Sequence, residues 1–493
     1  MKLVLAFLIA IPALVGQSVD LATKSERAKE LMAAGKFEEA VPAYRDLVRA
    51  VPSNPGLIMN LGMALHMAGH EQEAIREFRT VLRLQPEHLP ARLFLAEANL
   101  RLGEPSKAVE PLEKVIELQP DNRQAREMLA NALLALGRSE QASKQFRKLS
   151  GLEPENPKVW YGLGRTYEAL SRHAFAQLQK AAAESGYWLA LAADTRLKER
   201  QYSSAFYLYR QALSKIPSMH GVHAALAEIY RSTGHENWAA TEEEREGQLS
   251  QPDCGVQRLE CNFRAGRYSE VVSAAGAEPG AESYYWQTRA YNQLALEAFT
   301  RLGELPASAE LHELKASIYM GQKRYQESAQ EWQEALKLEP RDPEIQRQLA
   351  VALDLNGEHE AAQPLLQHLL SRQPNSAELN YLFGDTLLNQ QQAEPAIPYL
   401  KKAIERDPAL LGAHRALALA YLQIARPQQA VPHLKAALPI DSDGSLHYQL
   451  ARAYQTSGQP QLAQQTLRAY QDIRKSLGEE NREAEQEAQI TPP

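Results

Sequence analysis

Methionine and histidine side chains gather near the N-terminus in a pattern that could bind a soft metal ion. Met59, Met63 and Met67 follow one another at intervals of four residues, and His66 and His70 lie beside them. On a helix this spacing places the three thioethers on one face. Thioether and imidazole ligands suit Cu(I). The alternative, which we favour, is that the methionines pack against neighbouring helices or line a soft binding surface.

The only two cysteines of the chain, Cys254 and Cys261, could form a disulfide. In an oxidising compartment a lone pair of cysteines suggests such a bridge. A continuous α-helix would hold their Cα atoms about 10.5 Å apart, which is too far for a disulfide. Pro252 and Gly255 favour a turn at Cys254, which would shorten that distance. The sequence leaves two alternatives open, a bridge or two buried thiols.

Residues with the spacing of a catalytic site are not found elsewhere in the sequence. It has no glycine-rich phosphate loop, no G-x-S-x-G elbow and no H-E-x-x-H zinc motif. His220 and His223 have helical spacing, but no nearby carboxylate is arranged as a third metal ligand. We therefore expect a protein that is not an enzyme and has no cofactor.

A period of 34 residues organises the elements that carry these side chains. Between Pro55 and Gln85, apolar residues recur at intervals of three and four, which indicates two amphipathic helices. Gly69 lies where the first helix must end, and Pro86 ends the second. The same residue types recur in register at Pro52, Pro86, Pro120 and Pro154, at Gly35, Gly69, Gly103 and Gly137, and at Ala40, Ala74, Ala108 and Ala142. A fixed period of this length predicts stacked copies of one helical hairpin.

The hairpin resembles the tetratricopeptide repeat family, whose signature is W-x2-L-G-x2-Y followed by A-x3-F and P. The first half of the signature is present as Trp160, Leu163, Gly164 and Tyr167. The second half is present as Ala74, Phe78 and Pro86, and as Ala142, Phe146 and Pro154. The resemblance covers about residues 21 to 477. It implies an all-α fold, an α-solenoid superhelix of about fourteen stacked helix-turn-helix hairpins.

Two shortened units interrupt the period. The motif that begins at Tyr167 recurs at Tyr291, and neither copy contains the glycine turn, so we expect the two helices of each unit to abut or fuse. Each copy precedes an ordinary repeat, which indicates a duplicated segment of about 60 residues. The expected organisation is a signal peptide over 1–18, an N-terminal array over 19–156, an irregular middle array with the cysteines over 157–308, a C-terminal array over 309–477 and an acidic polar tail over 478–493.

The resemblance also implies which side chains line a binding groove, since first-helix positions tend to do so in this family. These positions are Met59, Met63, Tyr161, Arg165, Arg347, Tyr381, Asp385, Arg415, Tyr448 and Arg452. Tyrosine and arginine are common anchors of protein interfaces, although a solvated helix face is the alternative for each. The Lys/Asn/Arg clamp of some family members is not carried over, because its places hold Lys29, Met63 and Glu97.

The charge and the distribution of apolar residues indicate which kinds of partner and anchor to expect. The formal net charge is −7, and lysine and arginine are dispersed without a basic stripe, so we expect no nucleic acid partner. After residue 20 no apolar run is long enough for a transmembrane anchor.

The first residues have the layout of a secretory signal peptide. Lys2 precedes the apolar run Leu3–Val15, and Gly16, Gln17 and Ser18 offer small residues for cleavage. The alternative is a buried N-terminal helix. We expect export to a periplasm or to the medium.

These observations together favour a non-catalytic scaffold of the cell envelope that binds segments of partner proteins in its groove. A copper-handling protein that uses the methionine and histidine cluster is one alternative. An envelope glycan-binding protein, which would depend on the groove tyrosines, is another.

Overall fold

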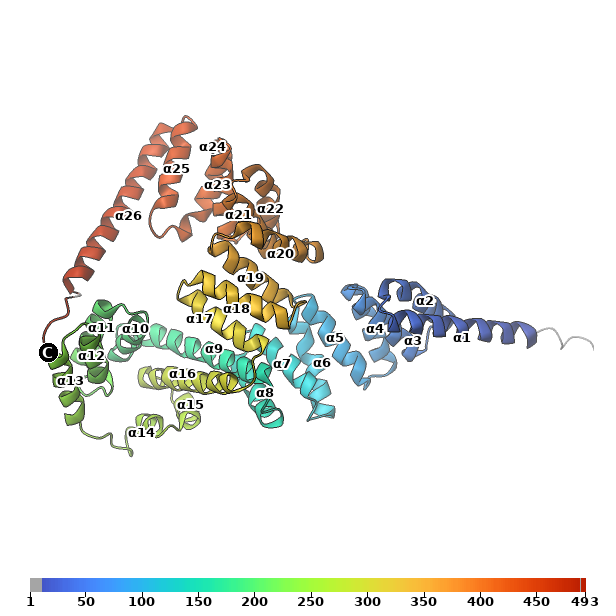
Figure 1. Ribbon diagram of the computed structural model, residues 1–493, viewed down its shortest axis with the longest axis horizontal. Helices are drawn as coiled ribbons and strands as arrows, with labels where there is room; N and C mark the ends of the chain where they lie inside the picture. The colour runs from blue at the N-terminus through green and yellow to red at the C-terminus, as the bar shows by residue number, and fades with distance from the viewer. Residues whose placement is uncertain (1–10, 488) are drawn as a thin grey trace, which may run out of the picture. The chain divides into compact units, whose positions relative to one another are not determined.

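The computed structural model describes residues 11–487 and 489–493, and these residues form helices and connecting turns without a strand (Figure 1). The helices up to residue 182 are α1 (Ile11–Ala33), α2 (Phe37–Ala50), α3 (Pro55–Met67), α4 (Glu71–Leu84), α5 (Leu89–Arg101), α6 (Pro105–Leu118), α7 (Arg123–Ala135), α8 (Ser139–Leu152) and α9 (Pro157–Ala182). The next are α10 (Gly186–Lys198), α11 (Tyr202–Lys215), α12 (Val222–Ser232), α13 (Glu236–Gln248), α14 (Arg258–Arg264), α15 (Tyr268–Ala277), α16 (Ala281–Glu304), α17 (Ala309–Gly321) and α18 (Tyr325–Leu338). The last are α19 (Pro343–Leu355), α20 (His359–Arg372), α21 (Ala377–Asn389), α22 (Ala393–Arg406), α23 (Leu411–Gln423), α24 (Pro427–Ala437), the 3₁₀ helix η1 (Leu438–Ile440), α25 (Ser445–Thr456) and α26 (Pro460–Glu487).

The hairpin of α3 and α4 shows why the sequence folds in this way. The Asn54 side chain accepts a hydrogen bond from the backbone N–H of Leu57, and Pro55 occupies the first turn, so α3 begins here. Gly69 adopts φ +85°, a left-handed conformation that glycine reaches without a steric cost, and the chain reverses into α4. The predicted helix ends are therefore confirmed.

The predicted number of units is also confirmed within the described residues. Twelve pairs of consecutive helices pack as hairpins, and α9 and α16 are single long helices, which gives fourteen units. The two long helices have 26 and 24 residues and replace the two shortened repeats. Of the two forms expected for a shortened repeat, abutting or fused helices, the structure has the fused one.

The chain forms two compact units. Of the described residues, 11–173 and 288–301 belong to the first, and 174–287, 302–487 and 489–493 belong to the second. The segment boundaries predicted from the sequence, such as those at residues 156 and 308, follow the repeat pattern and do not coincide with the boundaries of these two units. Buried side chains of adjacent hairpins, mainly alanine and leucine, form apolar clusters that each extend over several hairpins, two in the first unit and one in the C-terminal array of the second.

Within the first unit, residues 157–173 of α9 pack antiparallel to residues 288–301 of α16. The rings of Tyr167 and Tyr291, which are the equivalent residues of the duplicated motif, stack at a centroid distance of 6.2 Å. Ser171 Oγ donates a hydrogen bond to Asn292 Oδ1 at 2.7 Å. Toward the other end of the contact, Arg301 pairs with Glu155 at 3.0 Å. The sequence motif did not predict that its two copies contact each other.

The predicted signal peptide falls mostly outside the described residues, since residues 1–10 are not described and α1 begins at Ile11. In the part of the chain that the structure describes, no helix combines the length and the apolar character needed to cross a membrane.

The close approach of helices at Gly162 provides a test of hairpin packing. An added Cβ at Gly162 would lie 2.3 Å from the fully buried ring of Phe146. We expect Gly162→Ala to lower the free energy of unfolding by about 1–3 kcal/mol through overpacking. Gly151→Ala is the control, because no atom lies within 4 Å of its added Cβ. Thermal unfolding followed by circular dichroism measures both, and equal midpoints for the two variants would contradict the packing described.

Candidate functional site

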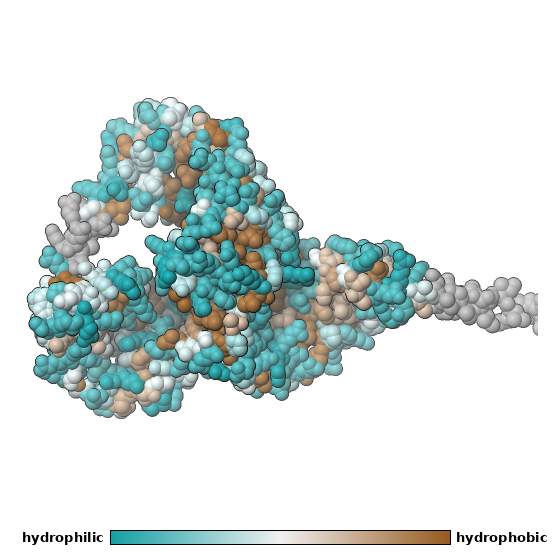
Figure 2. Space-filling view, in the orientation of Figure 1, coloured by the Kyte–Doolittle hydropathy of each residue, from teal (hydrophilic) through white to brown (hydrophobic). Residues whose placement is uncertain are grey.

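The candidate site lies on the first helices of the four C-terminal hairpins, α19, α21, α23 and α25, all in the second unit. These helices carry six of the predicted groove residues. Arg347 is on α19, Tyr381 and Asp385 are on α21, Arg415 is on α23, and Tyr448 and Arg452 are on α25. In the space-filling view, apolar patches alternate with hydrophilic ones over the C-terminal helices (Figure 2).

Tyr381, Asp385 and Arg415 form an electrostatically coupled group. The positive charge of Arg415 favours the ionised forms of both Tyr381 and Asp385. Burial and the neighbouring carboxylate of Asp354 outweigh that attraction and raise the pKa of Asp385 to about 6. The face therefore contains a poorly solvated carboxyl that a further cation would stabilise in its charged form.

Asp354 and His359 complete this group, although the sequence analysis did not identify them. His359 Nδ1 lies 2.7 Å from Asp354 Oδ1, and Asn389 Nδ2 donates a hydrogen bond to Asp354 Oδ2 at 3.2 Å. Asp354 and His359 flank the turn between α19 and α20. The positions of Asp354 and His359 do not recur with the 34-residue period, so nothing in the sequence singles them out. Their contact is seen only in the folded structure.

A cleft of about 860 Å³ continues this face toward the C-terminus. It is lined by α21, α23, α24 and α25, and it includes apolar side chains such as Leu388 and Leu422 together with Gln423 and Arg452. Leu388 lies one helical turn beyond Asp385 on α21, so the cleft and the half-buried carboxyl are neighbours. This size is in the range of sites that accept a ligand group.

The remaining groove candidates of α19 and α25 are held by neighbours in the fold. The Arg347 guanidinium lies 2.5 Å from Glu344 and also pairs with Glu378 of α21, so it bridges two consecutive first helices. Arg452 lies over the ring of Tyr448 at 6.0 Å, and that ring contacts the ring of Tyr470. Tyr448 is 42% exposed, which leaves much of its ring accessible to a ligand.

The candidates of the first unit lie in different environments. Met59 is buried in the core, Met63 is half-buried against the same core, and Met67 is 45% exposed. On α9, Tyr161 is half-buried, and Arg165 is exposed with Glu168 at 3.9 Å. Met59 is thus a packing residue and not part of an accessible surface, which corrects its assignment to a groove.

His66 is a structural residue of the first unit. It is fully buried, with Nδ1 2.6 Å from Glu71 and Nε2 3.4 Å from Glu97. Burial alone would lower the pKa of His66, but hydrogen bonds to the two carboxylates and their charge outweigh it and raise the pKa to about 9. Arg101 completes the network through Glu71 at 2.9 Å.

The proposed Cu(I) ligands are therefore not brought together. Both ring nitrogens of His66 face carboxylates, His70 pairs with Glu38 at 3.0 Å, and Met59 points into the core. Within the described residues, no group of three or more histidine, cysteine, aspartate or glutamate side chains could hold a metal ion. The geometry does not support the copper alternative.

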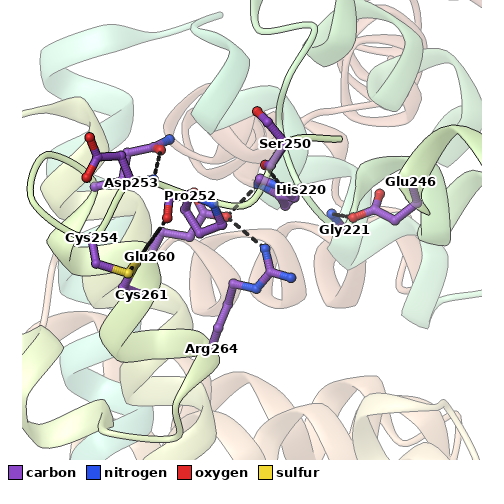
Figure 3. Close-up of polar contacts among 11 residues, drawn as sticks. His220, Gly221, Glu246, Ser250, Pro252, Asp253, Cys254, Glu260, Cys261 and Arg264 are labelled. Atoms are coloured by element: carbon purple, nitrogen blue, oxygen red, sulfur yellow. Dashed lines mark hydrogen bonds and ion pairs between the residues drawn. A yellow bond between two sulfur atoms is a disulfide. The ribbon is translucent and has the colours of Figure 1, made fainter. Parts of the chain in front are cut away.

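Cys254 and Cys261 are joined by a disulfide (Figure 3). Cys254 lies in the turn before the short helix α14, which shortens the distance between the two Cα atoms to 5.6 Å. Next to the bridge, His220 Nδ1 lies 2.6 Å from Glu260 Oε1, and His220 Nε2 contacts the carbonyl oxygen of Ser250 at 3.0 Å. The bridge and the pair His220–Glu260 connect the irregular segment to the start of α12.

Comparisons with known proteins agree with the repeat pattern. Three family models described as tetratricopeptide repeat match, the first over residues 103–165 and 319–384, the second over 25–78, 68–123, 281–343 and 381–445, and the third over 444–469. The solved structure of MamA, residues 41 to the end, from Desulfovibrio magneticus RS-1 is 22% identical, covers 34% of this chain and 96% of its own, and has a TM-score of 0.32. A second MamA crystal structure is 16% identical, covers 35% of this chain and 94% of its own, and has a TM-score of 0.31. A search of curated proteins gives no match.

The raised pKa of Asp385 predicts a specific dependence of stability on pH. The folded state binds this proton more tightly than the unfolded state, so the free energy of unfolding falls as the pH rises from about 4 to about 6. Asp385→Asn should remove this dependence and raise the free energy of unfolding at pH 7 by about 1–2 kcal/mol. Urea unfolding at several pH values measures it, with the exposed Glu405→Gln on α22 as control. An unchanged pH dependence in Asp385→Asn would refute the assignment.

His66 should give a pH dependence of the same sign at higher pH, because its pKa is also raised in the folded state. Its stabilising interaction is fully present below the unfolded pKa of 6.5 and is lost as the pH rises through about 9. His66→Gln should lower the free energy of unfolding by about 2–3 kcal/mol at pH 6. At pH 10, where His66 is neutral, the variant and the unsubstituted protein should have nearly the same free energy of unfolding. His70→Gln, on the surface, serves as control in the same unfolding series. A loss of equal size at both pH values would show that His66 acts through packing and not through its charge.

Proposed function

Since the chain belongs to the tetratricopeptide repeat family, we propose that it is a non-catalytic protein-interaction scaffold whose first-helix face on α19, α21, α23 and α25 binds a segment of a partner protein. The observation that carries this proposal is the cleft of about 860 Å³ beside the coupled group of Tyr381, Asp385 and Arg415. The cleft combines apolar side chains with polar ones that can form directed hydrogen bonds, and both kinds of contact are used to recognise a ligand segment.

The chemistry of the face indicates the kind of segment that it binds. Apolar lining from Leu388, Leu419 and Leu422 suits one or two apolar side chains of the ligand. Asp385, whose pKa is raised by burial and by Asp354, gains an ion pair when a lysine or arginine of the ligand approaches. We therefore propose a partner segment that carries a basic residue beside an apolar one.

The cell envelope is the proposed location of the protein. The charged and apolar N-terminal residues Lys2 and Leu3–Val15 have the order of a signal peptide. The disulfide between Cys254 and Cys261 suits an oxidising compartment. Both features support export to a periplasm or to the medium.

A photo-crosslinking amino acid tests the binding face directly. Gln423 lines the cleft and is exposed, whereas Arg372 is exposed on the second helix α20. In cells that produce the protein, a crosslinker at position 423 should capture a defined partner peptide, identified by mass spectrometry, and one at position 372 should not. Equal capture at both positions would contradict the proposed face.

Affinity for the captured segment then tests the proposed contacts. Asp385→Asn should weaken binding by about tenfold or more if the ligand supplies a cation, since a charge-assisted hydrogen bond is lost. Arg372→Ala should leave the affinity unchanged. Titration calorimetry of the purified protein with the synthetic segment measures both affinities. An unchanged affinity in Asp385→Asn would contradict the proposal that a basic residue of the segment pairs with Asp385.

A further inference from the structure

The C-terminal end of the chain contacts a helix that precedes it by more than 250 residues. After α26 ends at Glu487, residues 489–493 lie near α12 (Figure 1). There Tyr230 Oη donates a hydrogen bond to the carbonyl oxygen of Thr491 at 2.6 Å. Both segments belong to the second unit. Ile490 and Pro493 are half-buried, so the contact involves more than one residue of the end segment.

Tyr230 belongs to a cluster of rings that we call the aromatic site. Its members, from α11, α12 and the start of α13, are Phe206, Tyr230, His235 and Trp238. The ring of Tyr230 lies 5.6 Å from the rings of both Phe206 and Trp238, and His235 stacks on Trp238 at 4.1 Å. Aromatic surfaces of this kind bind proline rings and extended backbone.

The aromatic site lies where a stack of hairpins ends. In the C-terminal array each hairpin packs on the next, as α22 does on α23 and α24 on α25. Among the described residues, α13 makes no substantial contact with α14, so the hairpin of α12 and α13 has no successor of the usual kind. In a repeat array the end of a stack leaves apolar surface that another element must cover.

The hydroxyl group of Tyr230 needs an acceptor at this position. Tyr230 is fully buried, and a buried hydroxyl without a partner is costly. Burial and the charge of Glu242 raise the pKa of Tyr230, so the group stays protonated and donates. The Thr491 carbonyl is a suitable acceptor, because a segment followed by two prolines favours an extended conformation in which carbonyl groups have no internal partner.

We propose that the aromatic site is a binding site for an extended, proline-containing segment, and that residues 489–493 of this chain fill it in cis. A partner protein with a similar apolar and proline-containing segment competes with residues 489–493 for the same site. This inference is independent of the face on α19, α21, α23 and α25. Tethering gives the cis segment a high effective concentration, so a free peptide binds the intact chain weakly.

A competition experiment with three proteins tests the proposal. The probe is a fluorescently labelled peptide with the sequence of residues 489–493, Gln-Ile-Thr-Pro-Pro, and fluorescence anisotropy reports its binding. The proteins are the intact chain, the chain truncated after Glu487, and the truncated chain with Tyr230→Phe. We expect the truncated chain to bind the peptide at least about tenfold more tightly than the intact chain. Tyr230→Phe should weaken that binding by about fivefold, since one hydrogen bond is lost.

Tyr209→Phe in the truncated chain is the matched control. It also removes a hydroxyl from a buried tyrosine, which donates to Asp194 on α10 instead of to the C-terminal segment. Its peptide affinity should equal that of the truncated chain, and circular dichroism verifies that both tyrosine variants remain folded. Alanine in place of both prolines of the peptide should weaken binding.

Three results would overturn the proposal. The first is no measurable binding to the truncated chain, and the second is equal binding to the truncated and intact chains. The third is an intact chain that forms a dimer by light scattering and becomes monomeric on truncation, because the end segment would then act in trans. Faster amide hydrogen exchange in α12 and α13 after truncation would support the cis contact.

Discussion

A helical hairpin of this chain cannot bury its apolar faces alone, and this constraint explains most of the structure. In the N-terminal and C-terminal arrays a first helix packs on the second helix of the preceding hairpin, so buried apolar side chains form clusters that extend over several hairpins. Wherever the succession is interrupted, some other element has to cover the exposed face. In the first unit the fused helix α9 is covered by α16, and at the end of the stack of α12 and α13 the C-terminal segment covers Tyr230.

The hairpins could be predicted from the sequence because their determinants are local. Asn54, Pro55 and Gly69 act on their own backbone or on the next turn, so their positions alone indicate where α3 begins and ends. The 34-residue period then extends that result to the other hairpins. Two shortened units were also expected, because a missing glycine turn is a local feature, although the sequence did not decide between abutting and fused helices.

Contacts between distant segments could not be predicted in this way. Nothing in the spacing of the Tyr167 motif shows that it meets its own copy at Tyr291, and nothing in the polar tail indicates a hydrogen bond to Tyr230. The partners of the candidate metal ligands could not be predicted from the sequence either. His66 has the right spacing for a metal-binding face, yet Glu71 and Glu97 bind its ring, and Glu97 comes from the next hairpin. The Asp354–Asp385 pair likewise depends on how α19 and α21 pack.

The antiparallel contact of α9 and α16 has a consequence for how the two copies of the motif can change. Because Tyr167 faces Tyr291, the motif in α9 and its copy in α16 are each the packing surface of the other. In symmetric dimers, self-complementary contacts have this property, and one substitution alters both sides at once. Here the copies lie in one chain and can be substituted separately. Because the two side chains share the space between α9 and α16, a larger side chain in one copy requires a smaller one in the other. Sequence divergence between the two halves of the duplication is therefore coupled, and their aromatic stack limits how far apart they can drift.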